Sequence, residues 1–164
     1  MLRKHIISNA SQATATETAL TPDGMHVPAL ATVLVTSESP DHPVDYLFDG
    51  HDGPSGTRWI ASADGEQTLI VAFDTPQTIR EVALETEEPS ASRTQVLTLS
   101  LSQDGGQTYR EVLRQEFNFS PPGTTFERER WSVPAARVTH LRVAIQPHKG
   151  GAPCRATLTS LTIR

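Results

Sequence analysis

The sequence predicts an all-β domain, an antiparallel jelly-roll β-sandwich of about eight short strands. Three segments alternate between apolar and polar residues with a period of two, which is typical of half-buried antiparallel strands. They are residues 68–73, 95–102 and 140–145. Turn signals rich in Gly, Pro and Asp separate the strand-like segments. Many short strands joined by such turns favour a sandwich or a jelly roll.

The first part of the chain differs in character from the rest. Residues 1–28 are a low-complexity stretch with few apolar anchors, so we expect a poorly held arm, or one strand docked late onto the domain. Residues 29–164 then form one β-sandwich domain with no second linker. The opening residues lack the apolar region of a signal peptide. The chain as given is therefore expected in the cytoplasm, and a secreted location is expected if it is a fragment of a larger protein.

Weaker strand signals complete the domain. The last of them carries Leu158, Leu161 and Ile163, which cannot share one face without an extra residue, so we expect a bulge near residues 159–160. The weaker signals lie at residues 32–37, 78–85, 109–117, 125–133 and 156–163.

Composition and charge exclude several classes of protein. The 164 residues suit a single domain, and 14 Lys+Arg against 19 Asp+Glu give a net charge of −5. This balance argues against nucleic-acid binding, which needs a basic face. No apolar run approaches the roughly 20 residues of a membrane span, so we expect no membrane insertion. A single cysteine, Cys154, excludes an internal disulfide and a Cys-based zinc site.

No catalytic motif is present, and the chain is predicted not to be an enzyme. The sequence lacks a nucleophile elbow, a P-loop and a helical zinc-protease motif. Cys154 as a nucleophile would need a base, and nothing in the sequence places His140 or His148 against its sulfur. A packed or idle thiol is the favoured interpretation.

A long Gly-rich loop, residues 46–59, carries the most distinctive chemistry. Asp49, Asp52 and Thr57 could supply oxygens to a hard cation such as Ca²⁺, which takes roughly 6–8 oxygen ligands. The alternative is that the Asp-Gly steps simply make turns, with the aspartates accepting hydrogen bonds from nearby backbone amides.

This loop and the segments after it resemble a known family. The loop ends in Trp59 and is followed by the strand-like residues 67–73 and 76–84, then by the Ser-Gln-Asp-Gly-Gly turn of residues 102–106 and the closing strands. Over roughly residues 30–164 this order is similar to the coagulation-factor C-type, or discoidin-like, domain. The resemblance implies a galactose-binding-like jelly roll. The family includes family 32 carbohydrate-binding modules, lipid-binding domains and protein-interaction modules.

The resemblance also implies a structural calcium ion and a ligand site. In sugar-binding members, calcium sits beside the loop that corresponds to Asp49, Asp52 and Thr57, and a glutamate near the C-terminus completes the site. Ser160 stands at that glutamate position and is a weaker ligand. Family ligands bind at loops on one end of the sandwich. The candidate ligand-binding residues in those loops are His42, Arg93, Asn118, Phe119, His148 and Arg155.

We therefore predict a non-catalytic binding module with carbohydrate as its ligand. Sugar sites use an aromatic platform, for which Phe119 is the best candidate, and the alternative for Phe119 is a core position at a strand end. The alternative function is an intracellular protein–protein interaction or assembly module that uses the Arg/Glu-rich strands within residues 110–131. From the residues alone, the favoured interpretation of these strands is a solvated face with cross-strand ion pairs. The negative charge makes lipid binding a poor interpretation.

Overall fold

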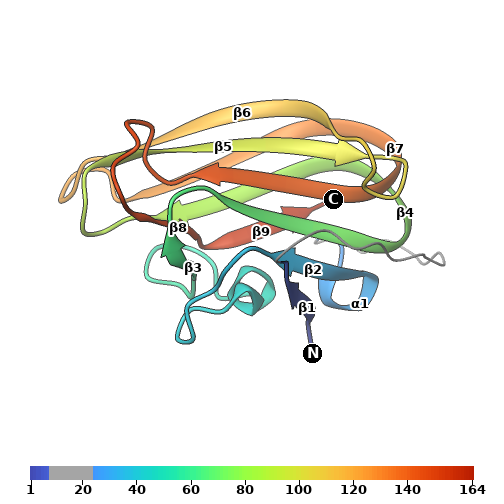
Figure 1. Cartoon of the computed structure of the whole chain (residues 1–164), viewed down its shortest axis with the longest axis horizontal. Coiled ribbons are helices and arrows are strands. Elements are labelled where there is room, and N and C mark those ends of the chain that lie inside the picture. Colours follow the sequence, from blue (N-terminus) through green and yellow to red (C-terminus); the bar gives the residue numbers. More distant parts are fainter. Residues whose placement is uncertain (8–23) are drawn as a thin grey trace.

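The computed structural model of the chain describes residues 1–7 and 24–164. Nine strands and two short helices follow one another in this part of the chain (Figure 1). They are β1 (Arg3–Ile6), α1 (Val27–Leu30), β2 (Ala31–Val35), the 3₁₀ helix η1 (Val44–Phe48), β3 (Trp59–Asp64), β4 (Gln67–Glu87), β5 (Arg93–Ser102), β6 (Arg110–Phe119), β7 (Phe126–Gln146), β8 (Arg155–Leu158) and β9 (Ser160–Ile163).

Two long strands, β4 and β7, give the domain its layers. The first half of β4 pairs with β2 and with the second half of β7, and that half of β7 also pairs with β5. The second half of β4 pairs with β9 and with the first half of β7. Register shifts between residues 72 and 81 of β4 mark the point where the paired strands pass from one layer to the other.

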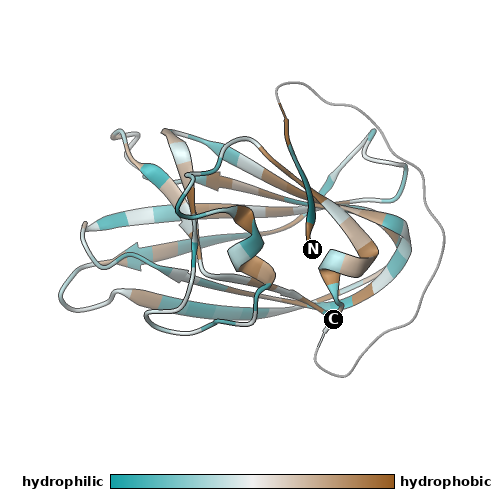
Figure 2. Cartoon of the chain, turned by 90° about the horizontal axis from the view of Figure 1, so that it is seen from below, coloured by the Kyte–Doolittle hydropathy of each residue, from teal (hydrophilic) through white to brown (hydrophobic). Residues whose placement is uncertain are grey.

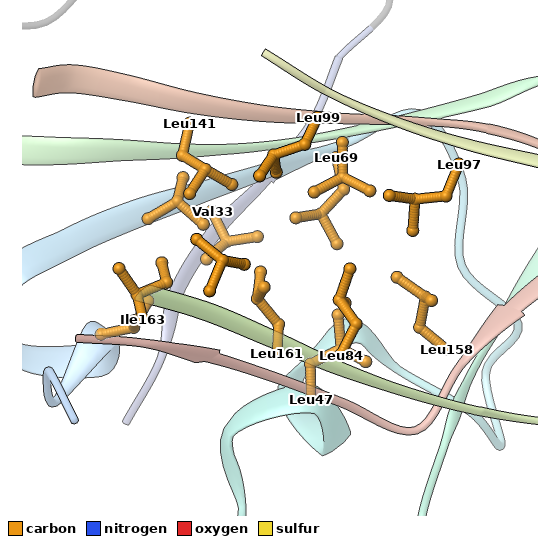
Figure 3. Packing of buried hydrophobic residues seen from close by; sticks show 14 of the residues in the cluster. Val33, Leu47, Leu69, Leu84, Leu97, Leu99, Leu141, Leu158, Leu161 and Ile163 are labelled. Carbon is orange, nitrogen blue, oxygen red and sulfur yellow. The ribbon is translucent and has the colours of Figure 1, made fainter. Parts of the chain in front are cut away.

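The core lies between these layers. Figure 3 shows Leu69, Leu97 and Leu99 on one side, facing Leu84 and Leu161 on the other. All five side chains are almost completely buried. Interdigitated side chains from two inner faces are what hold a β-sandwich together. The predicted all-β sandwich is confirmed. Hydrophobic residues concentrate toward the middle of the molecule, and the outer loops are largely hydrophilic (Figure 2).

Several predicted boundaries differ from the structure. The segments 68–73 and 78–85 are one bent strand, β4, and the segments 125–133 and 140–145 are one strand, β7. The expected bulge near residues 159–160 is a break between two strands: β8 pairs with β3, whereas β9 pairs with β4. An alternation of side chains cannot show that a strand continues through a bend, because the bend itself resets the alternation.

The N-terminal stretch is held in part. Residues 3–6 form β1, which runs parallel to β2 at one edge of the large sheet, and Val27 of α1 is buried in the core. Residues 8–23 of the predicted arm lie outside the described residues. In the described chain, no helix has the length and apolar character that crossing a membrane requires.

The Arg/Glu-rich strands are not neighbours in the sheet. β6 is an edge strand that pairs with β5 only, and β7 pairs with β4 and β5. The arginines of β7 form ion pairs with glutamates of β4: Arg128 with Glu85, and Arg130 with Glu81. The expected cross-strand pairs between the two charged strands are therefore wrong, because β5 lies between β6 and β7 in the sheet order.

Candidate functional site

A pocket of about 350 Å³ opens at the end of the sandwich where the β4–β5 and β7–β8 loops meet. The backbone N–H of Lys149 in the β7–β8 loop donates to the carbonyl of Thr94 at 2.8 Å and ties this loop to the start of β5. The volume lies in the range of small-molecule sites. Its lining residues are Ser39, His42, Arg58, Ile60, Glu88, Ala91, Arg93, Cys154, Arg155 and Thr157.

Three of the six predicted ligand-binding residues line this pocket. They are His42 in the turn before η1, Arg93 at the start of β5 and Arg155 at the start of β8. Segments more than 50 residues apart in the sequence therefore meet at this pocket. The other three do not line it. His148 accepts a hydrogen bond from the Gly150 N–H at 2.9 Å, which closes its own turn.

Asn118 and Phe119 lie on β6, away from the pocket lining. The exposed Asn118 accepts a 2.6 Å hydrogen bond from the Thr94 hydroxyl. Phe119 is only 3% exposed and belongs to the hydrophobic core. The platform interpretation of Phe119 therefore does not hold in this structure, and its core alternative describes the residue, because the Phe119 ring points inward from the strand end.

Arg93 is the structural centre of the pocket. Its side chain is 4% exposed and forms an ion pair with Glu88 at 3.2 Å. One guanidinium nitrogen, Nη1, also donates to the carbonyls of Pro147 and Arg155, each at 2.9 Å. The Cys154 sulfur lies 3.5 Å from the same nitrogen. Arg93 thus joins the β4–β5 loop to the segment that leads into β8.

His42 has a defined orientation. Its Nδ1 lies 3.1 Å from the carbonyl oxygen of Arg58. Because a carbonyl only accepts hydrogen bonds, Nδ1 carries the proton in the neutral ring and Nε2 is an acceptor. Nε2 has no partner among the described residues, so it can accept a hydrogen bond from a ligand hydroxyl.

The sequence interpretation selected neither Arg58 nor Glu88. Glu88 pairs with the buried Arg93, and Glu87 accepts the Ser55 N–H at 3.1 Å. Arg58 precedes the buried Trp59 at the start of β3. The alternation of a strand places the neighbour of a buried residue on the other face, and that signal could have identified Arg58.

The predicted calcium loop is closed by its own hydrogen bonds. The Thr57 hydroxyl donates to one oxygen of Asp49 at 2.7 Å, and the His51 N–H donates to the other at 2.9 Å. Partial burial raises the pKa of Asp49, but these donors outweigh it and the net pKa lies below its ordinary value. A Cβ at Gly56 would lie 2.1 Å from the His51 carbonyl, so only glycine fits this turn.

In the described structure, neither Asp52 nor Ser160 forms a hydrogen bond or an ion pair with Asp49 or Thr57. Burial raises the pKa of Asp52, and the negative charges of Glu85 and Asp49 raise it further. Ser160 lies on β9 directly opposite Glu85. Glu85 accepts the Gly53 N–H at 2.7 Å and an Arg128 hydrogen bond at 2.5 Å.

In this conformation, the side-chain oxygens of the predicted calcium ligands are not arranged to bind the ion. The carboxylate oxygens of Asp49 accept an N–H and an O–H donor, and the guanidinium of Arg128 supplies the positive charge beside Glu85. Within residues 1–7 and 24–164, no group of three or more His, Cys, Asp or Glu side chains is arranged to hold a metal ion. Calcium binding at Asp49, Asp52, Thr57 and Ser160 stays a prediction of the sequence that a melt can test.

Replacing Glu85 by Ala is expected to lower the free energy of unfolding by about 1–3 kcal/mol, because the Gly53 N–H and the Arg128 guanidinium lose a nearly buried acceptor. Urea denaturation measures the loss. Glu127→Ala is the matched control, since Glu127 lies on the same sheet region and the described residues give its side chain no partner. The control should change stability by less than about 0.5 kcal/mol.

A melt of the unmutated protein tests calcium binding directly. Because the Arg128 guanidinium already supplies positive charge beside Glu85, the melting temperature should be the same in millimolar CaCl₂ and in EDTA. An ion bound to the native state at roughly 100 times its Kd would add about 2.7 kcal/mol and raise the melting temperature by several degrees. A rise in melting temperature of that size would show that the loop does bind calcium.

Comparisons with known proteins agree with the fold. A model of the F5/8 type C domain matches residues 32–158. No curated protein matches the sequence. A pectin-binding carbohydrate-binding module superposes with a TM-score of 0.60, at 16% identity over 82% of this chain and 90% of that one.

Two further structures show the same likeness. A family 32 carbohydrate-binding module of Clostridium perfringens NanJ, in complex with galactose, gives a TM-score of 0.56 at 17% identity over 81% of this chain and 92% of that one. The family 32 module of AlyQ, in complex with 4,5-unsaturated mannuronic acid, gives 0.55 at 20% identity over 82% and 95%. At these identities the likeness is one of fold.

Proposed function

Because the chain belongs to the F5/8 type C domain family, we propose that it is a non-catalytic module that binds carbohydrate in the pocket at the end of the sandwich. The observation that carries the proposal is the convergence of His42, Arg93 and Arg155 on one pocket of about 350 Å³. The similar structures are named as binding pectin, galactose and unsaturated mannuronic acid, and all three ligands are saccharides.

The pocket chemistry suits a polyol. The acceptor Nε2 of His42 can receive a hydroxyl hydrogen, and the guanidinium groups of Arg58 and Arg155 can donate to sugar oxygens. Arg93 and Glu88 also line the pocket and form an ion pair with each other. Such a set orients a ligand without offering an activated nucleophile, because the described structure places no histidine or carboxylate in contact with Cys154.

Cys154 makes the proposal testable. It is the only cysteine of the chain, it is partly exposed, and it lines the pocket. A saccharide bound there should slow alkylation of Cys154 by iodoacetamide several-fold. The measurement is a glycan array on the purified domain, followed by alkylation rates with each saccharide that binds.

The matched control moves the thiol out of the pocket. In a Cys154→Ser, Ser120→Cys variant, the thiol sits at an exposed loop position outside the pocket lining, and the same saccharides should leave its alkylation rate unchanged. An array without a hit, or hits that protect neither thiol, would contradict binding at this pocket.

The protein-interaction alternative stays a prediction. The charges expected to form its surface are partly used within the domain, since Arg128 and Arg130 pair with glutamates of β4. A second pocket, lined in part by Val112, Leu113 and Trp131 of the same two strands, favours the alternative. A pull-down that returns one stoichiometric protein, together with an empty glycan array, would support the interaction module instead.

A further inference from the structure

The pocket carries positive charge in a negatively charged chain. Arg58, Arg93 and Arg155 line it with a single acidic residue, Glu88, whereas the whole chain has a net charge of −5. Three cations against one anion leave two positive charges at the site. Charge of that sign, gathered in a concave site, attracts and orients an anionic group.

The two surplus charges belong to Arg58 and Arg155. Arg93 is neutralised by Glu88 at 3.2 Å. Arg58 donates through Nη1 to the Glu87 carbonyl at 3.0 Å and has no carboxylate partner among the described residues. The exposed side chain of Arg155 has neither an ion pair nor a hydrogen bond in the same part of the chain.

Several other arginines of this protein have such a partner. They pair with carboxylates as Arg3–Asp74, Arg128–Glu85, Arg130–Glu81 and Arg164–Glu81. Arg58 and Arg155 are therefore two guanidinium groups that the fold brings to one pocket and leaves available for an external acceptor.

The pocket lacks the surface that a neutral sugar ring stacks on. Its apolar lining comes from Ile60 and Ala91, and none of the residues that line it is Phe, Tyr or Trp. Trp59, which follows Arg58, and Phe119, which lies opposite Arg93 on the neighbouring strand, are both buried in the core. What this site offers instead is charge-assisted hydrogen bonding, which is about twice as strong as bonding between neutral groups.

We propose that the ligand is an acidic saccharide that contains uronic acid, with its carboxylate held by Arg58 and Arg155. The inference rests on the proposed carbohydrate-binding function and names the class of sugar. The planar fork of a guanidinium matches a carboxylate through two parallel N–H···O bonds. The acceptor Nε2 of His42 then receives a ring hydroxyl. The Arg93–Glu88 pair keeps the backbone of Arg155 in place, because Arg93 donates to its carbonyl.

The test compares acidic saccharides with their neutral counterparts. Trimers of galacturonate, glucuronate and mannuronate are titrated calorimetrically into the full chain, each beside its carboxyl-reduced trimer, which differs only in the charged group. We expect at least one acidic trimer to bind tenfold or more tightly than its reduced form. Its affinity should fall as NaCl rises from 50 to 500 mM, since partly exposed charges are screened.

Variants assign the effect to the two arginines. Arg58→Gln and Arg155→Gln should each weaken the acidic trimer by about 10- to 100-fold, and should weaken the reduced trimer far less, by about threefold or less, because that trimer loses only a hydrogen bond between neutral and charged groups and no ion pair. Arg80→Gln is the control, because it removes the same charge from an exposed position of β4 outside the pocket.

The outcomes separate this inference from the proposed function. Equal binding of acidic and reduced trimers, with Cys154 protected by both, overturns the acidic ligand and leaves carbohydrate binding standing. Binding of neutral array sugars alone, or tighter binding of a sulfated neutral trimer, also overturns it. If acetate protects Cys154 from alkylation to the same extent as the acidic trimer, the pocket is a general anion site and the acidic-saccharide proposal is overturned. If no saccharide binds or protects Cys154, both proposals fall.

Discussion

Arg93→Leu is expected to lower the free energy of unfolding by about 3–5 kcal/mol. The substitution leaves Glu88 without its counter-ion and the carbonyls of Pro147 and Arg155 without their donor, and breaking a buried pair in this way has that cost. For a domain of this size the melting temperature should fall by roughly 6–20 °C. Thermal and urea denaturation measure both quantities.

Arg80→Leu is the matched control for this loss. It makes the same chemical change at an exposed position of β4, and its effect should stay within about 0.5 kcal/mol. A double-mutant cycle isolates the ion pair: Glu88→Gln should destabilise the wild type and cost little in the Arg93→Leu background. If Arg93→Leu unfolds at the wild-type midpoint, Arg93 is not the structural centre of the pocket.

Phe119→Ala should destabilise the domain by a similar amount, about 3–5 kcal/mol. The ring is 3% exposed and packs in the core at the end of β6, directly opposite Arg93 on β5. Truncating such a ring removes buried apolar surface and leaves a cavity. Urea denaturation measures the loss, and Asn118→Ala next to it should cost about 1 kcal/mol or less, since only an exposed hydrogen bond to Thr94 disappears.

Phe119→Leu separates the two roles that were open for this residue. The variant keeps most of the buried volume and should fold, with saccharide affinity within about twofold of the wild type. A stacking platform behaves in the opposite way. If Phe119 were a stacking platform, its substitution would leave stability unchanged and abolish saccharide binding, and that result would show that its ring is exposed to the ligand.

The predicted strands show where local pattern suffices. The segment 95–102 alternates in sequence, and Leu97, Leu99 and Leu101 are all buried on β5 as expected, but Ser100 and Ser102 on the polar side of the alternation are buried too, so the strand is not half-buried. β3 was not predicted, because only Trp59 and Ala61 are buried in it and four of its six residues face outward or lie partly exposed. A short strand at the edge of a small sheet leaves too little alternation to detect.

The candidate site was predicted in part for a similar reason. His42, Arg93 and Arg155 were selected as polar residues in loops, and the fold brings them to one pocket. The partners of Arg93 could not be predicted. Two of them are backbone carbonyls, of Pro147 and Arg155, more than 50 residues away. Backbone acceptors leave no trace in the residue types that a sequence displays.

By itself the sequence determined the fold class and the absence of the usual catalytic motifs, because period-two alternation and residue inventory are local properties. Only the tertiary structure decided that Phe119 is core, that Glu85 is bound by Arg128, and that Arg58 joins Arg155 at one pocket. Such contacts depend on how two strands bend between layers. A one-residue shift of register moves a side chain to the opposite face, so the composition of a site is a property of the assembled sheets.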